Sequence, residues 1–219
     1  MWNNQVMIML LEGIRDTLYM TLTSAVIGYV IGLPMGILLA VTDRDGIRPN
    51  AVIYKLLDVT ANLIRSVPFL ILLIVLIPFT RFVVGKSYGP TATIVPLVIA
   101  AAPYIARMVE SSLKEVDAGV IEAARSMGAS DFAVITRVML VEARTSLIVG
   151  ATISLGTILG YSAMAGTVGG GGLGDIAIRY GYTRWQTDIM VVTVILLVIL
   201  FQIFQTAGMK LASRLEKRK

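Results

Sequence analysis

The sequence predicts an all-α integral membrane protein with five transmembrane helices, an external N-terminus, a cytoplasmic C-terminus and short cytoplasmic helices between the third and fourth spans. Apolar residues make up 56% of the 219 residues, charged residues only 15%, and the mean hydropathy is +0.81. An ordinary soluble domain has about 25% charged residues. This composition, together with several long runs free of charge, indicates a chain that lies in a lipid bilayer. We expect a single transmembrane domain over residues 1–219.

Charge-free runs mark the predicted spans. A helix needs about 20 apolar residues to cross the ~30 Å hydrocarbon core of a membrane. The second run is shorter than this, so its helix must extend back past Arg65, whose long side chain can reach the headgroups. The five runs are Thr17–Thr42, Ser66–Thr80, Ser87–Ala106, Thr145–Gly174 and Ile189–Met209.

The placement of Lys and Arg predicts the orientation of the chain. Cytoplasmic segments of membrane proteins carry an excess of these residues. With an external N-terminus, all but five of the 19 Lys and Arg residues fall on the cytoplasmic side, the five being Arg15, Arg81, Lys86, Arg179 and Arg184. The net charge of +5 then reflects contact with anionic lipid rather than nucleic acid, because the basic residues are spread over every inner segment.

The N-terminal segment has no basic residue before Arg15, so it lacks the start of a cleavable signal and is expected to belong to the mature protein. Trp2 and residues 7–11 are expected either to lie along the outer membrane interface or to extend the first span. The sequence contains no His and no Cys. Imidazole bases, thiolate nucleophiles and the usual zinc ligands are therefore excluded, and we expect no catalytic residue and no metal site.

Small residues recur every four positions along the first span. Gly28, Gly32 and Gly36 share one helix face and would let another helix approach closely. Gly150 and Gly160 belong to similar patterns in the fourth span. We expect these faces to pack within one subunit, with a subunit interface as the alternative. A chain with so few spans cannot easily surround a substrate, which favours a dimer.

Prolines predict kinks in several spans. Each proline removes a backbone donor, and a membrane tolerates this where neighbours or water satisfy the freed carbonyl. Such kinks are typical of a water-accessible path, although membrane helices are in general richer in proline than soluble ones. The five prolines inside or at the edges of spans are Pro34, Pro68, Pro78, Pro96 and Pro103.

Two glycine motifs resemble nucleotide-binding loops without meeting their requirements. The run Gly169–Gly174 fits G-x-G-x-x-G in letters, but it follows a predicted span rather than a strand. Gly85–Ser87 resembles the end of a phosphate loop, but Thr80 replaces its first glycine. Both lie on the predicted outer face. If this protein uses ATP, another chain must hydrolyse it.

The longest cytoplasmic segment, Arg107–Arg144, predicts two short helices separated by a glycine. Asp117 can cap the first helix, Gly128 ends it, and Ser130 can cap the second. The apolar side of the first helix consists of Val116, Val120, Ala124 and Met127. From these residues alone, the segment is either an amphipathic connector on the lipid surface or a functional element.

Part of this segment resembles a known motif. The string EAARSMGASDFAVITRVML, Glu122–Leu140, is similar to the Glu-Ala-Ala loop of ATP-binding-cassette importer permeases. Three further strings resemble the methionine branch of that family, whose members are small and have five spans: NLIRSVPFLILLIVLIPFTR, IVPLVIAAAPYIARMVESSLKEVDAGVIEAA and GYSAMAGTVGGGGLGDIAIRYGY. The resemblance extends over nearly the whole chain.

The resemblance implies the permease subunit of an ATP-driven importer for methionine or a related amino acid, which works by alternating access and is not itself an enzyme. Its loop helix would fit a groove on a separate ATPase subunit, which binds the ATP and Mg. The implied partners are a second copy of the chain, two ATPase subunits, an extracytoplasmic substrate-binding protein and the lipid of the bacterial inner membrane. The implied coupling residues are Val120, Ile121, Glu122, Ala123, Ala124, Ser126, Met127, Gly128 and Ala129.

The translocation path is expected near two segments. In the fourth span, Tyr161, Ser162 and Met164 precede the glycine run and combine polar with soft apolar surface. Ser66 and Pro68 form the second candidate, because the proline leaves a backbone carbonyl without its usual donor. Ordinary helix packing is the alternative for both groups.

Two other classes of function compete with an importer subunit. A passive channel or secondary carrier would work without an ATPase partner. An intramembrane enzyme would have little chemistry available beyond a Ser/Lys pairing.

Overall fold

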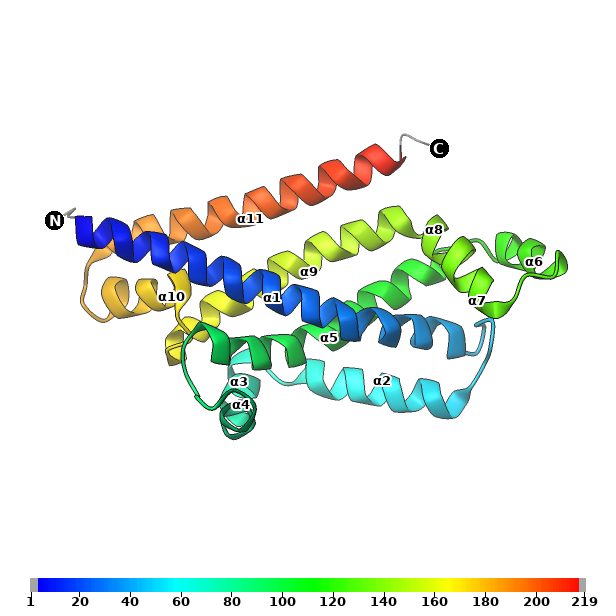
Figure 1. Ribbon diagram of the computed structural model, residues 1–219, viewed down its shortest axis with the longest axis horizontal. Coiled ribbons are helices and arrows are strands. Elements are labelled where there is room, and N and C mark those ends of the chain that lie inside the picture. The colour runs from blue at the N-terminus through cyan, green and yellow to red at the C-terminus, as the bar shows by residue number, and fades with distance from the viewer. Residues whose placement is uncertain (1–3, 217–219) are drawn as a thin grey trace.

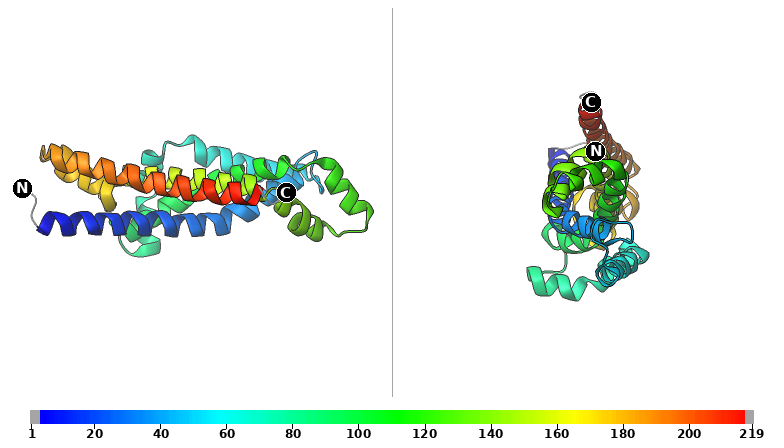
Figure 2. Two further views of the ribbon diagram at one scale, coloured as in Figure 1. Left: turned by 90° about the horizontal axis from the view of Figure 1, so that it is seen from above. Right: turned by 90° about the vertical axis from the view of Figure 1, so that its right-hand side faces the viewer.

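The helix α5 lies at the centre of an elongated bundle (Figure 1). The computed structural model describes residues 4–216. Its helices are α1 (Asn4–Thr42), α2 (Ala51–Ser66), α3 (Phe69–Val75), α4 (Ile77–Val84), α5 (Pro90–Lys114), α6 (Ala118–Ser126), α7 (Asp131–Ala133), η1 (Val134–Met139), α8 (Leu140–Glu142), α9 (Arg144–Ala165), η2 (Gly166–Val168), α10 (Gly172–Ile176), η3 (Ala177–Tyr182) and α11 (Thr187–Glu216). The start of α1 and the helix α6 lie at opposite ends of the long axis, as Figures 1 and 2 show.

The seam between α1 and α5 is a close helix contact built on glycine. A β-carbon at Gly32 would lie 2.6 Å from the carbonyl oxygen of Ala102, and one at Gly36 would lie 2.5 Å from that of Ala106. Helices in membranes commonly meet at such small residues, because the two backbones can then touch. The prediction that this stripe packs within one subunit is confirmed.

The glycines of α9 serve different neighbours. Gly150 faces Met108 of α5, and Gly156 faces the ring of Phe201 on α11. Apart from Gly160 itself, its chain neighbours and the backbone of its own helix, no described atom lies within 4 Å of the position that a β-carbon would take on Gly160. Gly150 and Gly156 of this second pattern therefore pack against other helices of the same chain, whereas Gly160 faces open space.

Four helical runs within residues 4–216 are long and apolar enough to cross a membrane. The number of candidate spans rises to five if the bent pair α2 and α3 is counted as one span. Residues 7–11 belong to the continuous helix α1, so they extend the first predicted span; Trp2 lies outside the described residues. The fourth predicted span, Thr145–Gly174, lies within the helical run Arg144–Tyr182 that is long and apolar enough to cross a membrane, and the first helix of this run, α9, ends at Ala165. It ends there because a 3-10 turn and a run of glycines with positive φ follow.

The second predicted span extends back past Arg65, as expected, but not as one straight helix. α2 and α3 are bent by 100° at the break between them. Val67 there has extended backbone angles (φ −82°, ψ 125°), which is the conformation that a following proline imposes. Pro68 also lacks the N–H that would continue the helix. The predicted kink is therefore a sharp corner.

Candidate functional site

The predicted coupling residues lie on α6 and the turn that follows it. The carboxylate of Asp117 accepts hydrogen bonds from the backbone N–H groups of Gly119 (2.8 Å) and Val120 (3.3 Å). These bonds satisfy two donors of the first turn that have no partner inside a helix. The cap predicted at Asp117 is confirmed, and it fixes where α6 begins.

The end of α6 is fixed by Gly128, whose φ of +84° lies in the left-handed region. Its N–H donates to the carbonyl of Arg125 (2.9 Å), and the N–H of Ala129 donates to the carbonyl of Ala124 (3.1 Å). This pair of bonds is a Schellman motif, which closes a helix at a left-handed residue. A residue with a β-carbon would be strained at this position. The glycine elbow is confirmed.

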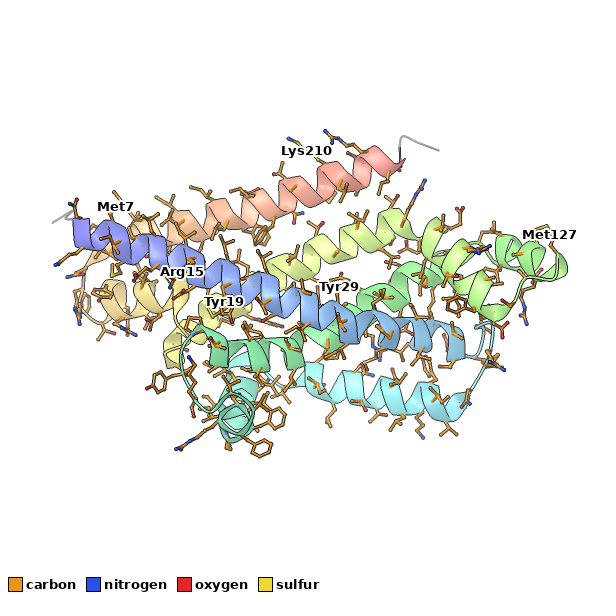
Figure 3. The ribbon with its side chains drawn as sticks, in the orientation of Figure 1. Met7, Arg15, Tyr19, Tyr29, Met127 and Lys210 are labelled. Atoms are coloured by element: carbon orange, nitrogen blue, oxygen red, sulfur yellow. The ribbon has the colours of Figure 1, made fainter. Side chains whose placement is uncertain are left out.

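Exposure divides the predicted coupling residues into two groups. Ala124 is buried against the core of the chain, and Ile121 and Ala129 are half-buried beside it. Met127 is 82% exposed and lies at the tip of the molecule (Figure 3). The sequence placed Met127 on the same side as Ala124, which is wrong because Met127 caps the helix instead of continuing it. The other exposed members are Val120, Glu122, Ala123, Ser126 and Gly128.

A second helical segment, from α7 through η1 to α8, leads from this turn back to α9. The hydroxyl of Ser130 accepts a hydrogen bond from the N–H of Ala133 (3.3 Å), so the predicted second cap is also confirmed. Val134 and Met139 are buried on the inner side of the segment. Asp131 lies 3.9 Å from the guanidinium of Arg48, in the link between α1 and α2. Apolar contacts hold this segment to the bundle, since so exposed an ion pair contributes little.

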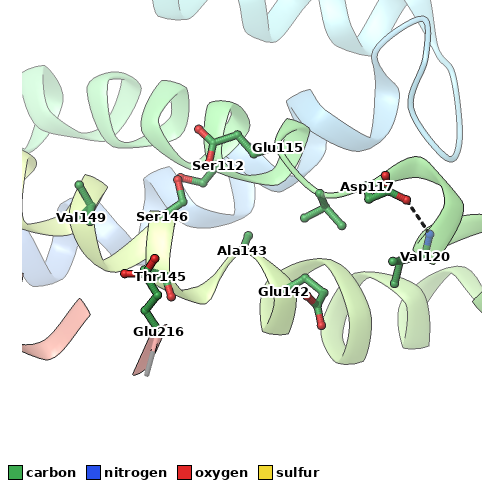
Figure 4. A pocket seen from close by; sticks show the side chains of 11 residues that line it. Ser112, Glu115, Asp117, Val120, Glu142, Ala143, Thr145, Ser146, Val149 and Glu216 are labelled. Atoms are coloured by element: carbon green, nitrogen blue, oxygen red, sulfur yellow. Dashed lines mark hydrogen bonds between the residues drawn. The ribbon is translucent and has the colours of Figure 1, made fainter. Parts of the chain in front are cut away.

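Cavities flank α6 on two sides. A cavity of about 540 Å³ lies between the start of α6, the end of α5 and the start of α9 (Figure 4). The close-up shows the Asp117 cap at its rim, and the hydroxyl of Ser146 donates to that of Ser112 (3.0 Å) on its wall. A second cavity, of about 330 Å³, is lined by Ile121 on the other side. Open space therefore flanks α6 on two sides.

A buried carboxylate joins three elements at the same end of the bundle. Glu110 of α5 is 4% exposed, and it accepts hydrogen bonds from Arg107 and Lys114, each at 2.7 Å. Arg107 also forms an ion pair with Asp58 of α2, and Lys114 forms one with Asp43 (2.6 Å), just after α1. We call these five residues the ion cluster. It fastens the end of α1 and the helix α2 to α5.

The sequence analysis missed the ion cluster. Arg107, Glu110 and Lys114 follow the spacing of neighbours on one helix face, which is a readable signal. Their partners cannot be found in this way, because Asp58 lies 49 positions from Arg107 along the chain. In the folded chain, the hydrogen bond from Lys114 lowers the pKa of Asp43 below its ordinary value.

The structure brings the two predicted path segments together. Phe69, which follows Pro68, stacks on Tyr161 with ring centroids 4.4 Å apart and an angle of 4° between the planes. Ser66 and Pro68 are exposed at the break between α2 and α3. The start of α3 and the last turns of α9 therefore share one wall.

The other two predicted path residues differ in their surroundings. Met164 is 51% exposed, close to one turn beyond Tyr161. Ser162 is buried, and its hydroxyl donates to the carbonyl of Leu159 (2.8 Å) in its own helix. Of the residues predicted in α9, Tyr161 and Met164 are thus available to a ligand in this conformation.

The glycine run Gly169–Gly174 forms a tight turn packed into the bundle. Its residue Gly169 accepts a hydrogen bond from the N–H of Gly89 (2.9 Å), and the N–H of Leu173 donates to the hydroxyl of Thr17 (2.9 Å). A helix rather than a strand precedes the run, so the geometry of a dinucleotide site is missing. The exposed edge beyond it consists of Arg179, Tyr182, Thr183, Arg184 and Trp185.

Comparison with known proteins finds relatives over nearly the full length. Residues 32–218 match the family described as binding-protein-dependent transport system inner membrane component. The probable D-methionine transport system permease protein of Vibrio cholerae is 46% identical over 96% of this chain and 93% of its own length. The D-methionine transport system permease protein of Escherichia coli K12 is 50% identical over 74% of each chain.

Solved structures of other proteins have a fold similar to that of this chain. A chain from the inward-facing conformations of the MetNI methionine ABC transporter matches 98% of this chain and 99% of its own, with a TM-score of 0.95 and 46% identity. A chain from an amino acid ABC transporter crystallised with histidines has a TM-score of 0.73 at 21% identity. The second likeness is one of fold alone.

Proposed function

Because this chain belongs to the family of binding-protein-dependent transport system inner membrane components, we propose that it is the permease subunit of an ATP-driven importer for methionine or a related amino acid. As a member of this family it is a multi-pass membrane subunit with no catalysis of its own. The ATP is hydrolysed on a partner chain. The methionine substrate is supported by the names of the relatives and of the structural neighbour.

In the proposed topology, the bent pair α2 and α3 is the second of five spans in a single domain. The N-terminus is external, and α6 faces the cytoplasm. The distribution of Lys and Arg supports this orientation. The same orientation puts the acidic and basic residues of the ion cluster near the cytoplasmic membrane surface, where charged side chains are least costly.

The observation that carries the proposal is that α6 is a well-defined helix with an exposed face at one end of the bundle. It is capped at both ends, exposed at Glu122 and Met127, and seated on the bundle through Ala124. Only Glu115–Asp117 separate it from α5, the central helix. A partner that moves α6 would move α5 as well, and with it α1 across the glycine seam. ATP-driven motion could thus reach the membrane spans.

The proposed assembly contains two copies of this chain, two ATPase subunits and an extracytoplasmic binding protein. Each α6 would enter a groove on one ATPase. The binding protein would meet the exposed edge from Arg179 to Trp185, which lies toward the opposite end of the bundle (Figure 1). Tyr161, Met164 and the break at Pro68 would face the substrate path.

The proposal is tested by substituting the elbow of α6. In Gly128→Asp the new side chain has open space around it, so the chain should still reach the membrane, but the strained turn should move α6 out of register with its partner. Methionine uptake by proteoliposomes that contain the ATPase and the binding protein should fall at least tenfold, while ATP hydrolysis continues. Normal uptake by this variant would contradict the coupling role.

Gly85→Asp provides the matched control. Gly85 also has a positive φ (+80°) and open space at the β-carbon position, but it ends α4, far from α6. Uptake by this variant should stay near the native level. If native proteoliposomes take up methionine without any nucleotide, a carrier or channel would replace the importer.

A further inference from the structure

A small cavity lies at the corner between α2 and α3. Its volume is about 140 Å³, and its walls include Arg65, Phe69, Leu72, Ala100, Tyr104 and Tyr161. These residues come from four elements, α2, α3, α5 and α9. Figure 1 places the corner near the middle of the long axis, between the end that carries α6 and the end that carries the N-terminus.

Arg65 is the charged residue of this cavity, and within residues 4–216 it has no carboxylate partner. Its guanidinium lies 5.9 Å from the centre of the Tyr104 ring, a cation–π distance. By contrast, Arg107 and Lys114 in the ion cluster each pair with two carboxylates. Arg65 is also exposed on the single chain, so a ligand can reach it.

The position of Arg65 along α2 makes its lack of a carboxylate partner significant. It lies seven residues beyond Asp58 on α2, which is about 10 Å further along a helix that rises ~1.5 Å per residue. An arginine that far from the ionic end of the bundle is costly next to lipid, and such residues usually line a path or a site. The sequence reading, that Arg65 reaches the headgroups, does not account for its position over Tyr104 and beside the cavity.

The chemistry of the walls selects one kind of ligand. A guanidinium presents a planar set of donors that matches a carboxylate in a bidentate pair. The hydroxyls of Tyr104 and Tyr161 are the other polar side-chain groups of the lining. Phe69, Leu72 and Ala100 supply apolar surface beside them. An amino acid with an apolar side chain has both matching parts.

We propose that Arg65, assisted by Tyr104 and Tyr161, binds the carboxylate of the transported amino acid at this corner of the translocation path. The proposal rests on the proposed import function, which it deepens by naming the group of the substrate that is recognised inside the membrane. The site would be a transient stop. High-affinity capture would still belong to the binding protein.

The test uses the natural absence of cysteine in this chain. Ala100→Cys places a single thiol in the cavity wall of the intact complex with its ATPase. The thiol is labelled with a negatively and with a positively charged methanethiosulfonate reagent, and the labelled fraction of this chain is measured by mass spectrometry. The negative reagent should react at least about threefold faster than the positive one, relative to their rates with free cysteine. Methionine should slow labelling, whereas methioninol, which lacks the carboxylate, should not.

Adding Arg65→Gln should abolish both the charge preference and the protection by methionine. Lys55→Gln removes an exposed cation from the same helix and should change neither. Equal protection by methionine and methioninol in the single Ala100→Cys protein would overturn the proposal without any change to Arg65. So would an unchanged charge preference in the Arg65→Gln protein. If native proteoliposomes import no methionine, the import function fails, while the charge preference still tests Arg65 separately.

Discussion

The seam between α1 and α5 and the turn after α6 use glycine for opposite reasons. At Gly32 and Gly36, a single added carbon atom would collide with the backbone of α5. At Gly128, the same carbon atom would meet nothing within 4 Å, but the backbone is left-handed. The seam needs glycine for its size, and the turn needs it for its conformation. Substitutions in the seam should therefore act on stability, and substitutions near α6 on function.

Gly32→Leu should have the largest effect on stability. The leucine side chain cannot fit against the Ala102 carbonyl, and overpacking of this kind costs ~3 kcal/mol or more when the neighbour is backbone. Thermal unfolding of the detergent-solubilised protein should show a strongly lowered midpoint. Gly160→Leu is the matched control, because that position in α9 is open. Equal midpoints for the two variants would mean that the seam is not tightly packed.

Glu110→Gln should have the next largest effect. It keeps the size of the side chain but leaves Arg107 and Lys114 without their shared charge, and breaking a buried ion pair costs about 3 kcal/mol. The same unfolding measurement checks this. The exposed Glu122→Gln on α6 should shift stability by less than about 0.5 kcal/mol. A similar loss of stability in both variants would mean that the ion cluster contributes no more to stability than the exposed surface of α6.

Acid should weaken the link between α1 and α5 to a smaller extent. The pKa of Asp43 is lowered by its bond to Lys114, so its contribution to stability is present above the unfolded pKa of about 3.9 and is lost as the pH falls through the lowered value. Asp43→Asn should be less stable than the native protein at neutral pH. The difference in unfolding midpoint should shrink below about pH 4. A difference that stays constant to lower pH would exclude this ion pair as its source.

Met127→Ala should have the smallest effect on stability and still impair transport. Its side chain is 82% exposed, so the unfolding free energy should change by less than about 0.5 kcal/mol. Coupled methionine uptake should nevertheless fall several-fold, because the variant lacks the apolar contact that we propose between Met127 and the ATPase. Unchanged uptake would restrict the coupling surface to the remaining residues of α6.

The sequence predicted features that depend on neighbours along the chain. The caps at Asp117 and Ser130, the elbow at Gly128 and the close packing of Gly32 all follow from local chemistry or helical spacing. Pro68 predicted a kink, but no sequence rule gives its 100° angle, which depends on what α3 packs against.

Features that depend on residues far apart in the chain were not predictable. The ion cluster joins α1, α2 and α5 through partners that only the fold brings together. The contact of Phe69 with Tyr161, which connects the two predicted path segments, also joins residues far apart in the chain. A single sequence shows where each charge lies, but not which charges meet.

The glycine seam packs α1 closely on α5, so we expect the two helices to move together as one lever. α1 has 39 residues, and at ~1.5 Å per residue it is about 58 Å long. Tilting a rod of this length by about 5° about one end displaces the other end by about 5 Å, close to the rise of one helical turn. In the proposed importer, a small rotation imposed at the α6 tip would thus be amplified by leverage before it reached the far membrane surface.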